Sequence, residues 1–306
     1  MPRVKACLLL ATVAAISCGC GGARVVTGHT KLSPSQIPVA RDATREDLIE
    51  AYNLIVHGIK SLNATVELKA TAGSKYSGVI DEYHEVKAFL LAARPAEIRV
   101  IGQAPVVGTT VFDMASDGDT FRVSIPSKKK YLVGPVAVER ASSKPIENLR
   151  PQHLLDALLW PEIRKEEAVI LREFNDENTR YYVLTVLRGG YQLEVLREIW
   201  FDRADFEVKR LLIFGPKGLL LSDVHLADWQ AADTASGQSA AAAVPAAATL
   251  FPRTIQIERP HEEYKLDLQV SKIVLNEEIP AERFKLEQPA GSELTRVGEA
   301  PENKQP

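Results

Sequence analysis

The feature that most limits the fold of this chain is a close succession of short segments in which apolar and polar residues alternate. The first follows Asn63, where Val66, Leu68 and Ala70 alternate with polar residues. A period of two is typical of β-strands that bury one face. Similar segments cover residues 79–91, 98–102, 109–115, 120–125, 130–134, 168–174, 181–187, 192–201, 207–214, 219–228, 254–258, 264–275 and 284–287. Short strands in such close succession indicate antiparallel neighbours rather than strand–helix–strand crossovers.

Turn-forming sequences separate these segments. Residues 116–119 read Ser-Asp-Gly-Asp, residues 188–190 read Arg-Gly-Gly, and residues 216–218 read Pro-Lys-Gly. Pro126 and Ser127 mark a further turn. Because Gly, Asp and Pro favour tight connections, we expect hairpins at these positions.

Two stretches have a helical period instead. Thr44 is suited to cap a helix, and Asp47 stands three residues later, as in a capping box. The apolar residues of this helix recur on one face: Leu48, Tyr52, Ile55, Ile59 and Leu62. A second helix is expected over residues 151–159, where Pro151 suits the first turn. Both apolar faces must rest on an apolar surface.

These elements predict an α+β, mainly β fold. We expect an unclosed antiparallel β-barrel, that is, one strongly curved sheet whose concave face is covered by the helices. Its interior is filled either by side chains or by a ligand, and the strands alone leave both open. The predicted domain covers residues 44–297, with a low-complexity Ala-rich insertion at 234–249 and a disordered tail at 298–306.

The N-terminus is typical of an export signal. A short basic start is followed by an apolar run over residues 6–16, which is shorter than the about 20 residues that span a bilayer. Residues 15–18, Ala-Ile-Ser-Cys, resemble the lipobox of bacterial lipoproteins, in which the cysteine is acylated. We therefore expect a lipoprotein signal peptide at 1–17 and a flexible tether at 18–43.

Two cysteines fit the lipidation site. Cys18 is preferred because cleavage before it leaves a cleaner apolar core, and Cys20 fits the same loose pattern. The alternative is a plain secretory signal with chance cysteines. The remaining cysteine, Cys7, also lies in the export segment, so no disulfide is expected in the folded domain.

Charge and motifs give no support for nucleic-acid binding or catalysis. The net charge is -3, the isoelectric point is near 6.1, and no basic stripe stands out. The sequence lacks a Gly-x-Ser-x-Gly motif and a phosphate-binding Gly-rich loop. Residues 84–88, His-Glu-Val-Lys-Ala, begin like a zinc-protease motif in an expected strand but end in Ala. We expect no catalytic residue, no metal site and no cofactor.

Several short motifs resemble, in order, those of the LolA/LolB family of lipoprotein carriers and receptors. Residues 93–100, Ala-Arg-Pro-Ala-Glu-Ile-Arg-Val, resemble the family's Arg-Pro step, and residues 105–111 resemble a Pro-Leu-Gly loop in LolB. Further matches follow at residues 116–121, Pro126, Tyr131, residues 251–255 and residues 284–291.

The resemblance implies a helix-capped open barrel with an apolar cavity for acyl chains. It implies that Arg94, with Pro95, takes part in ligand binding by controlling the lid of that cavity. The alternative is that Arg94 is a surface residue held in a turn by Pro95. Val106 and Val107 match the loop that LolB presents to the membrane, and two valines at a loop tip are costly to leave in water. The alternative is that both fold inward.

The expected function is that of a lipid-anchored protein of the outer membrane, facing the periplasm, which binds acyl chains or lipoproteins for trafficking or insertion. The membrane is contacted through the N-terminal lipid, and a periplasmic carrier protein is a further expected partner. The outer membrane is expected because the residue after either cysteine is Gly, not an acidic residue that favours inner-membrane retention in enteric bacteria. The alternatives are an interaction and stress-sensing module of the RseB type and, third, an envelope hydrolase.

Overall fold

The computed structural model describes residues 39–74, 79–136, 148–190, 192–235 and 249–297. The chain divides into two compact units, Met1–Val39 and Ala40–Pro306, and the elements below all belong to the second. The predicted signal peptide, Cys18 and Cys20, most of the tether, most of the Ala-rich insertion and the tail lie outside the described residues.

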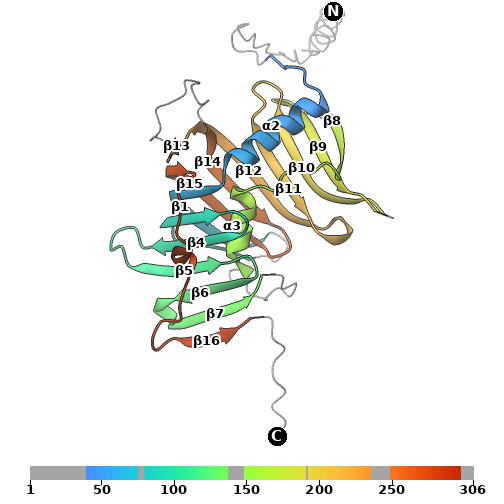
Figure 1. Ribbon diagram of the computed structural model, residues 1–306. Helices are drawn as coiled ribbons and strands as arrows, with labels where there is room; N and C mark the ends of the chain where they lie inside the picture. The colour runs from blue at the N-terminus through green and yellow to red at the C-terminus, as the bar shows by residue number, and fades with distance from the viewer. Residues whose placement is uncertain (1–38, 75–78, 137–147, 191, 236–248, 298–306) are drawn as a thin grey trace, which may run out of the picture. The chain divides into compact units, whose positions relative to one another are not determined.

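The described residues form one sheet of sixteen strands (Figure 1). In chain order the strands are β1 (Ser61–Ser74), β2 (Val79–Glu82), β3 (Val86–Ala93), β4 (Glu97–Gln103), β5 (Thr110–Ser116), β6 (Thr120–Ile125), β7 (Lys130–Pro135), β8 (Ala168–Asn175), β9 (Arg180–Arg188), β10 (Glu194–Asp202), β11 (Val208–Phe214), β12 (Leu220–Ala231), β13 (Asp233–Thr234), β14 (Leu250–Arg259), β15 (Tyr264–Leu275) and β16 (Glu293–Arg296). The helices are α2 (Arg45–Gly58) and α3 (Pro151–Leu158), with short 3-10 helices η2 (Pro126–Lys128), η4 (Pro216–Gly218) and η5 (Ala281–Phe284).

The order of strands across the sheet is β16-β7-β6-β5-β4-β3-β1-β15-β14-β12-β11-β10-β9-β8. Strands β3 to β7 form one meander and β8 to β12 another, and β1, β15 and β14 lie between the two and join them. Apart from β16 on β7 and β13 on β15, the neighbours are antiparallel. The sheet is strongly curved and is not closed into a barrel, as predicted.

The core lies between the concave face of the sheet and the two helices. Figure 1 shows α2 and α3 on this same side. The buried apolar residues of α2 are Leu48, Tyr52 and Val56, and they belong to one cluster with residues from β1, β4, β9, β10, β14 and β15. Each such side chain contributes about 1.5–3 kcal/mol when buried. The predicted helical cover of the concave face is therefore confirmed.

The predicted start of α2 is confirmed, and its predicted end is corrected. The side chain of Thr44 accepts a hydrogen bond from the main-chain N–H of Asp47, and the Asp47 carboxylate accepts one from the Thr44 N–H, which completes a capping box. The helix ends at Gly58, and Ile59 has extended backbone angles. Leu62 thus belongs to β1, where its side chain is buried from a strand instead of from the helix.

Two expectations for the strands are wrong, and strand β16 was not expected. Residues 284–287 form no strand, because Phe284 ends the 3-10 helix η5 and buries its ring there. The expected strand over 79–91 is divided into β2 and β3, so His84 lies between strands. Strand β16, which the sequence did not indicate, has four exposed residues and pairs through its backbone with β7.

Candidate functional site at the helical cover

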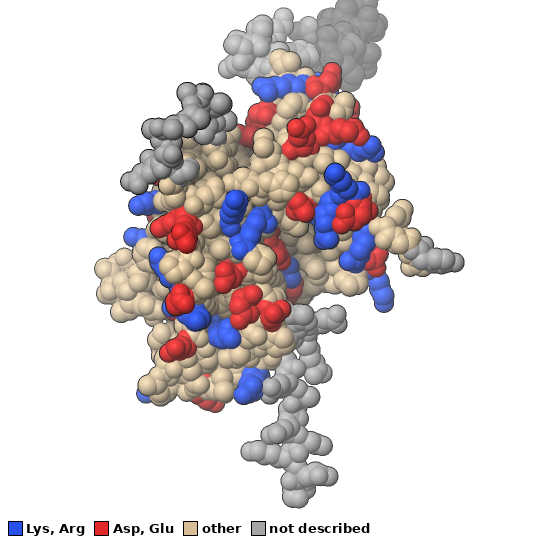
Figure 2. Space-filling model, viewed as in Figure 1, with Lys and Arg blue, Asp and Glu red and all other residues tan. Residues whose placement is uncertain are grey.

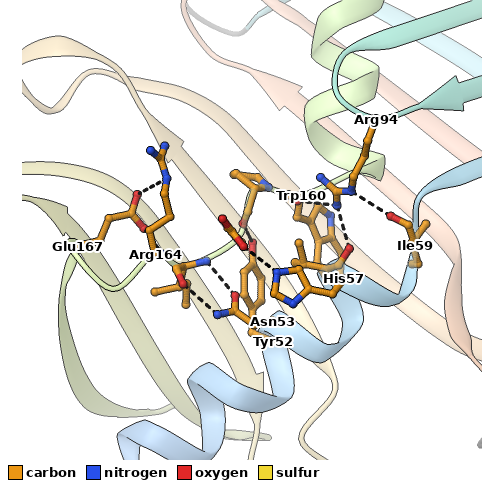
Figure 3. A network of polar contacts seen from close by, with 12 residues as sticks. Tyr52, Asn53, His57, Ile59, Arg94, Trp160, Arg164 and Glu167 are labelled. Carbon is orange, nitrogen blue, oxygen red and sulfur yellow. Dashed lines mark hydrogen bonds and ion pairs between the residues drawn. The ribbon is translucent and has the colours of Figure 1, made fainter.

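The helical cover consists of α2, α3 and residues 159–167, which connect α3 to β8. Helix α2 is joined to this connection by direct hydrogen bonds (Figure 3). The Tyr52 hydroxyl donates to the carbonyl oxygen of Pro161 at 2.9 Å. The Asn53 amide donates to the carbonyl of Ile163 at 2.9 Å and accepts from the Ile163 N–H at 2.8 Å. Because Asn53 uses both ends of its amide, it fixes the spacing of the two segments.

An ion pair adds a weaker contact on the outside. Nε2 of His57 lies 2.7 Å from Oε2 of Glu162, and both side chains are about half exposed. The hydrogen bond with His57 lowers the pKa of the Glu162 carboxyl. Exposed pairs of this kind contribute little to stability, so the pair orients the cover more than it holds it.

Arg94 lies in the turn between β3 and β4 and reaches under the C-terminal end of α2. Its Nε donates to the carbonyl of Ile59 at 2.9 Å, and its Nη2 donates to those of Val56 and Trp160 at 3.2 and 2.9 Å. The last carbonyls of a helix lack partners within the helix and attract a cation. Arg94 therefore links the end of α2, the sheet and the connection 159–167 through one side chain, as Figure 3 shows.

The two residues predicted to bind ligand, Arg94 and Pro95, lie in different environments. Arg94 is half-buried and lines a small apolar pocket, whereas Pro95 is exposed on the turn. The pocket is lined by Ile55, Val56, Ile59, Arg94, Leu158, Trp160, Trp229, Phe251 and Pro252. Its volume is about 10 Å³, which is room for about one water molecule. Side chains therefore fill the concave face beside Arg94 in this conformation.

A larger cavity lies on the other side of Trp160. Its volume is about 190 Å³, and it is lined by Tyr52, Asp156, Trp160, Pro161, Leu196, Arg197, Leu211 and Ile213. Burial raises the pKa of the Asp156 carboxyl, and it also raises the pKa of the Tyr52 hydroxyl, which remains a donor. The cavity thus combines apolar strand residues with buried polar groups from the cover.

Trp160 is the partition between the small pocket and the cavity, because it lines both. Its ring stacks on Tyr52 with centroids 5.8 Å apart and meets Trp229 edge-on at 6.0 Å. Its indole N–H donates to the carbonyl of Ala157 at 2.9 Å. Sequence reasoning did not single out Trp160 as functional, although a tryptophan directly after an apolar helix and before a proline was a visible signal.

The loop between β4 and β5 exposes the two predicted valines. Val106 is 96% exposed and Val107 is 70% exposed. The loop is closed by hydrogen bonds between Ala104 and Thr109 and from Gly108 to Ala104, and Gly108 has a φ of +64°. Figure 2 shows the end of this hairpin as an uncharged projection from the sheet. The two valines do not fold inward.

Nothing in the described ranges groups three or more His, Cys, Asp or Glu residues so that they could hold a metal ion. The zinc-protease-like run at 84–88 lies in the β2–β3 connection and in the start of β3. Neither of the helices in the described part of the chain is long and apolar enough to cross a membrane.

No protein-family model matches the sequence, and a search of curated proteins finds no match. Three of the solved structures to which the chain is similar, all at low identity, are described here. A LolA superfamily protein from Nitrosomonas europaea is 15% identical over 80% of this chain and 99% of its own, with a TM-score of 0.46. A DUF1329 family protein from Desulfovibrio piger is 13% identical over 78% and 95%, also with a TM-score of 0.46. A putative outer membrane lipoprotein-sorting protein domain from Vibrio parahaemolyticus is 12% identical over 78% and 94%, with a TM-score of 0.44.

Proposed function

We propose that this chain binds acyl chains, free or on lipoproteins, between the concave face of its sheet and the helical cover, and passes them to a membrane. The observation that carries the proposal is the attachment of the cover. Apolar faces of α2 and α3 lie on an apolar sheet, and the polar links between cover and sheet include hydrogen bonds from Arg94 to main-chain carbonyls and from Arg197 of β10 to Glu162 and Glu167. A cover held in this way can separate from the sheet without breaking a covalent bond.

The energies are compatible with opening. A hydrogen bond that is exchanged for water costs about 0.5–1.5 kcal/mol net. The links from Arg94 and Arg197 would therefore cost several kcal/mol together. Burial of an acyl chain contributes about 0.8 kcal/mol for each methylene, so a chain of about a dozen methylenes contributes roughly 10 kcal/mol. A bound chain would offset the opening of the cover, and transfer would follow from differential affinity between this site and a bilayer.

The rest of the proposal describes how the chain is attached to a membrane and how it contacts the bilayer. The chain is anchored in the outer membrane through lipid on Cys18 or Cys20 and faces the periplasm, where a carrier protein delivers the ligand. Val106 and Val107 support this role, because an uncharged apolar loop tip is suited to enter the surface of a bilayer. Catalysis has no part in the mechanism, since binding and release alone move the ligand.

The test is to purify the full chain from membranes and identify bound molecules by native mass spectrometry. We expect a stoichiometric acylated species that a fluorescent acyl probe displaces. The matched variants are Asn53→Ala, which loosens the cover by removing the hydrogen bonds between α2 and Ile163, and Asn178→Ala, which changes an exposed asparagine in the β8–β9 turn. The first should alter probe uptake and the second should not.

A second candidate function is a protein-interaction module without transport activity. The small volume of about 10 Å³ beside Arg94 favours it, because the closed interior is filled with side chains there. An empty protein that takes up no acyl probe would establish this module in place of the carrier.

A further inference from the structure

The β4–β5 loop, which exposes Val106 and Val107, has a basic neighbour at the same end of the sheet. Strands β4 to β7 run antiparallel one after another, so the β4–β5 and β6–β7 connections emerge at one end, as Figure 1 shows. The β6–β7 connection consists of the 3-10 helix η2 and Lys129, and η2 contacts β5. An apolar loop and a basic turn therefore lie side by side.

Three lysines occupy the basic turn and form no ion pairs. Lys128, Lys129 and Lys130 are all exposed, and none pairs with a carboxylate of a described residue. Glu293 of β16 lies opposite Lys130 in the strand pairing, but the two side chains form no ion pair in the described part of the chain. The Lys129 N–H donates to the carbonyl of Pro126 at 3.0 Å and closes the turn. The turn thus presents three positive charges that remain available to a partner.

The apolar loop beside the lysines carries no charge and extends beyond them. Residues 104–109 read Ala-Pro-Val-Val-Gly-Thr. Strand β5 pairs with β6 only as far as Asp113, whereas it pairs with β4 as far as Thr110, so the β4–β5 hairpin is the longer of the two. Surfaces that bind bilayers combine buried apolar area with attraction to anionic lipids. The two neighbouring connections supply one of these features each.

The charge on the other side of the loop has the opposite sign. Strand β3 pairs with β4 there, and the chain just before β3 carries the exposed residues Asp81, Glu82 and Glu85. Glu82 is balanced in part by Lys69, which lies 2.9 Å away. A negatively charged surface would therefore attract the lysine side of the loop and repel the β2–β3 side.

We propose that Lys128, Lys129 and Lys130 bind the anionic head groups of a bilayer while Val106 and Val107 enter its apolar layer beside them. The inference rests on the proposed function, in which this loop contacts a membrane, and adds to it the class of lipid and the orientation of the sheet. A bilayer fits this surface better than an acidic protein segment does. It offers negative charge at its surface and apolar depth beneath, which is the order that the lysines and the longer apolar hairpin require.

The size of the effect can be stated in advance. Each lysine close to an anionic membrane surface strengthens binding by about fivefold, so three lysines contribute up to about a hundredfold. Salt weakens this attraction, because the Debye length falls from about 10 Å at about 0.1 M to about 3 Å at about 1 M.

The experiment measures co-flotation of the full chain with two kinds of vesicle. One kind is phosphatidylcholine alone, and in the other about one third of the lipid is phosphatidylglycerol, which is anionic. We expect the anionic vesicles to bind at least about tenfold more tightly at about 0.1 M salt, and we expect this ratio to fall to about twofold or less at about 1 M salt.

The variant replaces the three lysines together, as Lys128→Gln, Lys129→Gln and Lys130→Gln. It should lower the ratio of the two affinities by about tenfold and leave binding to phosphatidylcholine unchanged, because the valines remain. The N-terminal segment is the same in every sample, so a change in the ratio is due to the substituted lysines.

The matched control removes three positive charges elsewhere on the folded part. Its lysines are exposed and lie in the connection 159–167, in η4 and in β15. The substitutions are Lys165→Gln, Lys217→Gln and Lys272→Gln. The net charge changes equally in the two triple variants, so only a local contact gives a larger loss in the first. Urea unfolding verifies that both are folded.

Two groups of results would overturn the inference, and they are distinguishable. Equal affinity of the unmodified chain for both kinds of vesicle, or an equal loss in the two triple variants, would remove the lysine surface as a lipid site. The proposed function would then stand, and an acidic protein segment would become the better occupant. Failure to associate with either kind of vesicle would remove the membrane contact of the proposed function and this inference with it.

Discussion

Nη2 of Arg94 lies 2.9 Å from the carbonyl oxygen of Trp160, so one hydrogen bond joins the β3–β4 turn to the connection that follows α3. The same side chain also holds two carbonyls at the end of α2. Three segments that are distant in sequence thus depend on one guanidinium, so loss of this side chain removes all of these contacts together.

Replacing Arg94 by Met keeps most of the apolar stem and removes all three hydrogen bonds. We expect the free energy of unfolding to fall by about 2–4 kcal/mol, because carbonyl oxygens in a partly buried site lose their donor. We also expect stronger binding of an apolar fluorescent dye, since the cover opens more often. Urea unfolding and dye titration measure the two effects.

The control is Arg122→Met, which removes a partly exposed ion pair with Asp117 and should have little effect. Unchanged dye binding in Arg94→Met would contradict the role of Arg94 in closing the cover.

His153 should make stability depend on pH. It lies half-buried in α3 against the hydroxyl of Tyr264, and desolvation together with the charges of Arg259 and Arg150 lowers its pKa well below 6.5. In the unfolded chain the histidine binds a proton below about pH 6.5, whereas in the folded chain it does not. The unfolded state then binds more protons, so the free energy of unfolding falls as the pH decreases below about 6.5.

For this one group the free energy of unfolding should change with pH by up to about 1.4 kcal/mol per pH unit. His153→Gln should remove this pH dependence. Urea unfolding at pH 7 and pH 5 gives the difference for each protein. Asp156 has a raised pKa and acts in the opposite direction, but it is present in both proteins. His261→Gln changes an exposed histidine and serves as the control. Equal loss of stability in acid for His153→Gln and the unmodified chain would rule this source out.

Val106→Glu with Val107→Glu should prevent the β4–β5 hairpin from entering a bilayer. Each valine that leaves an apolar environment loses about 1.5–3 kcal/mol, and a charge adds to the cost. We expect vesicle association and ligand delivery to fall at least tenfold, measured by co-flotation and by transfer of a fluorescent acyl probe. Stability should not change, because both side chains are already exposed. Leu193→Glu, on an exposed residue before β10, is the control, and equal delivery by all these proteins would refute the assignment.

Gly102 should not accept a side chain. It lies in β4 opposite Phe112 of β5, and a Cβ at this position would lie 2.4 Å from the Phe112 ring. We expect Gly102→Ala to lower the free energy of unfolding by about 1–3 kcal/mol through overpacking. In a Phe112→Leu background the same substitution should cost less, which a double-mutant cycle measures. Gly189→Ala meets open space and is the control for the loss of a glycine.

Much of the fold could be predicted because it depends on local pattern. The cap of α2 needs Thr44 and Asp47 three residues apart, and the antiparallel strands need apolar residues at every second position. The predictions failed where the path and pairing of the main chain, rather than the pattern of side chains, determine the structure. Strand β16 pairs with β7 although all of its residues are exposed, so its sequence has no alternation to detect. Phe284 was expected in a strand, but its ring is buried from a 3-10 helix instead.

The candidate site was predictable in part for the same reason. Arg94 and the valine pair were found from short motifs, since both lie in turns between recognisable strands. Asn53 and Trp160 were not found, because their partners lie about 110 and 66 residues away in the chain. Arg197 was harder still to predict as a residue that lines the cavity, because a charged residue in a strand is expected to face solvent. The bulge beside it cannot be located from one sequence.

The pairing of β1 with β15 has a consequence for how the protein is made. Leu62 lies opposite Leu275, so the two meanders of the sheet are joined only after more than two hundred residues have been synthesised. Contacts between such distant residues slow folding. Until β15 is complete, the first meander ends in β1, a long strand with one unpaired edge. Such edges attract other chains, so self-association during synthesis should begin at β1, and conditions that delay β15 should increase it.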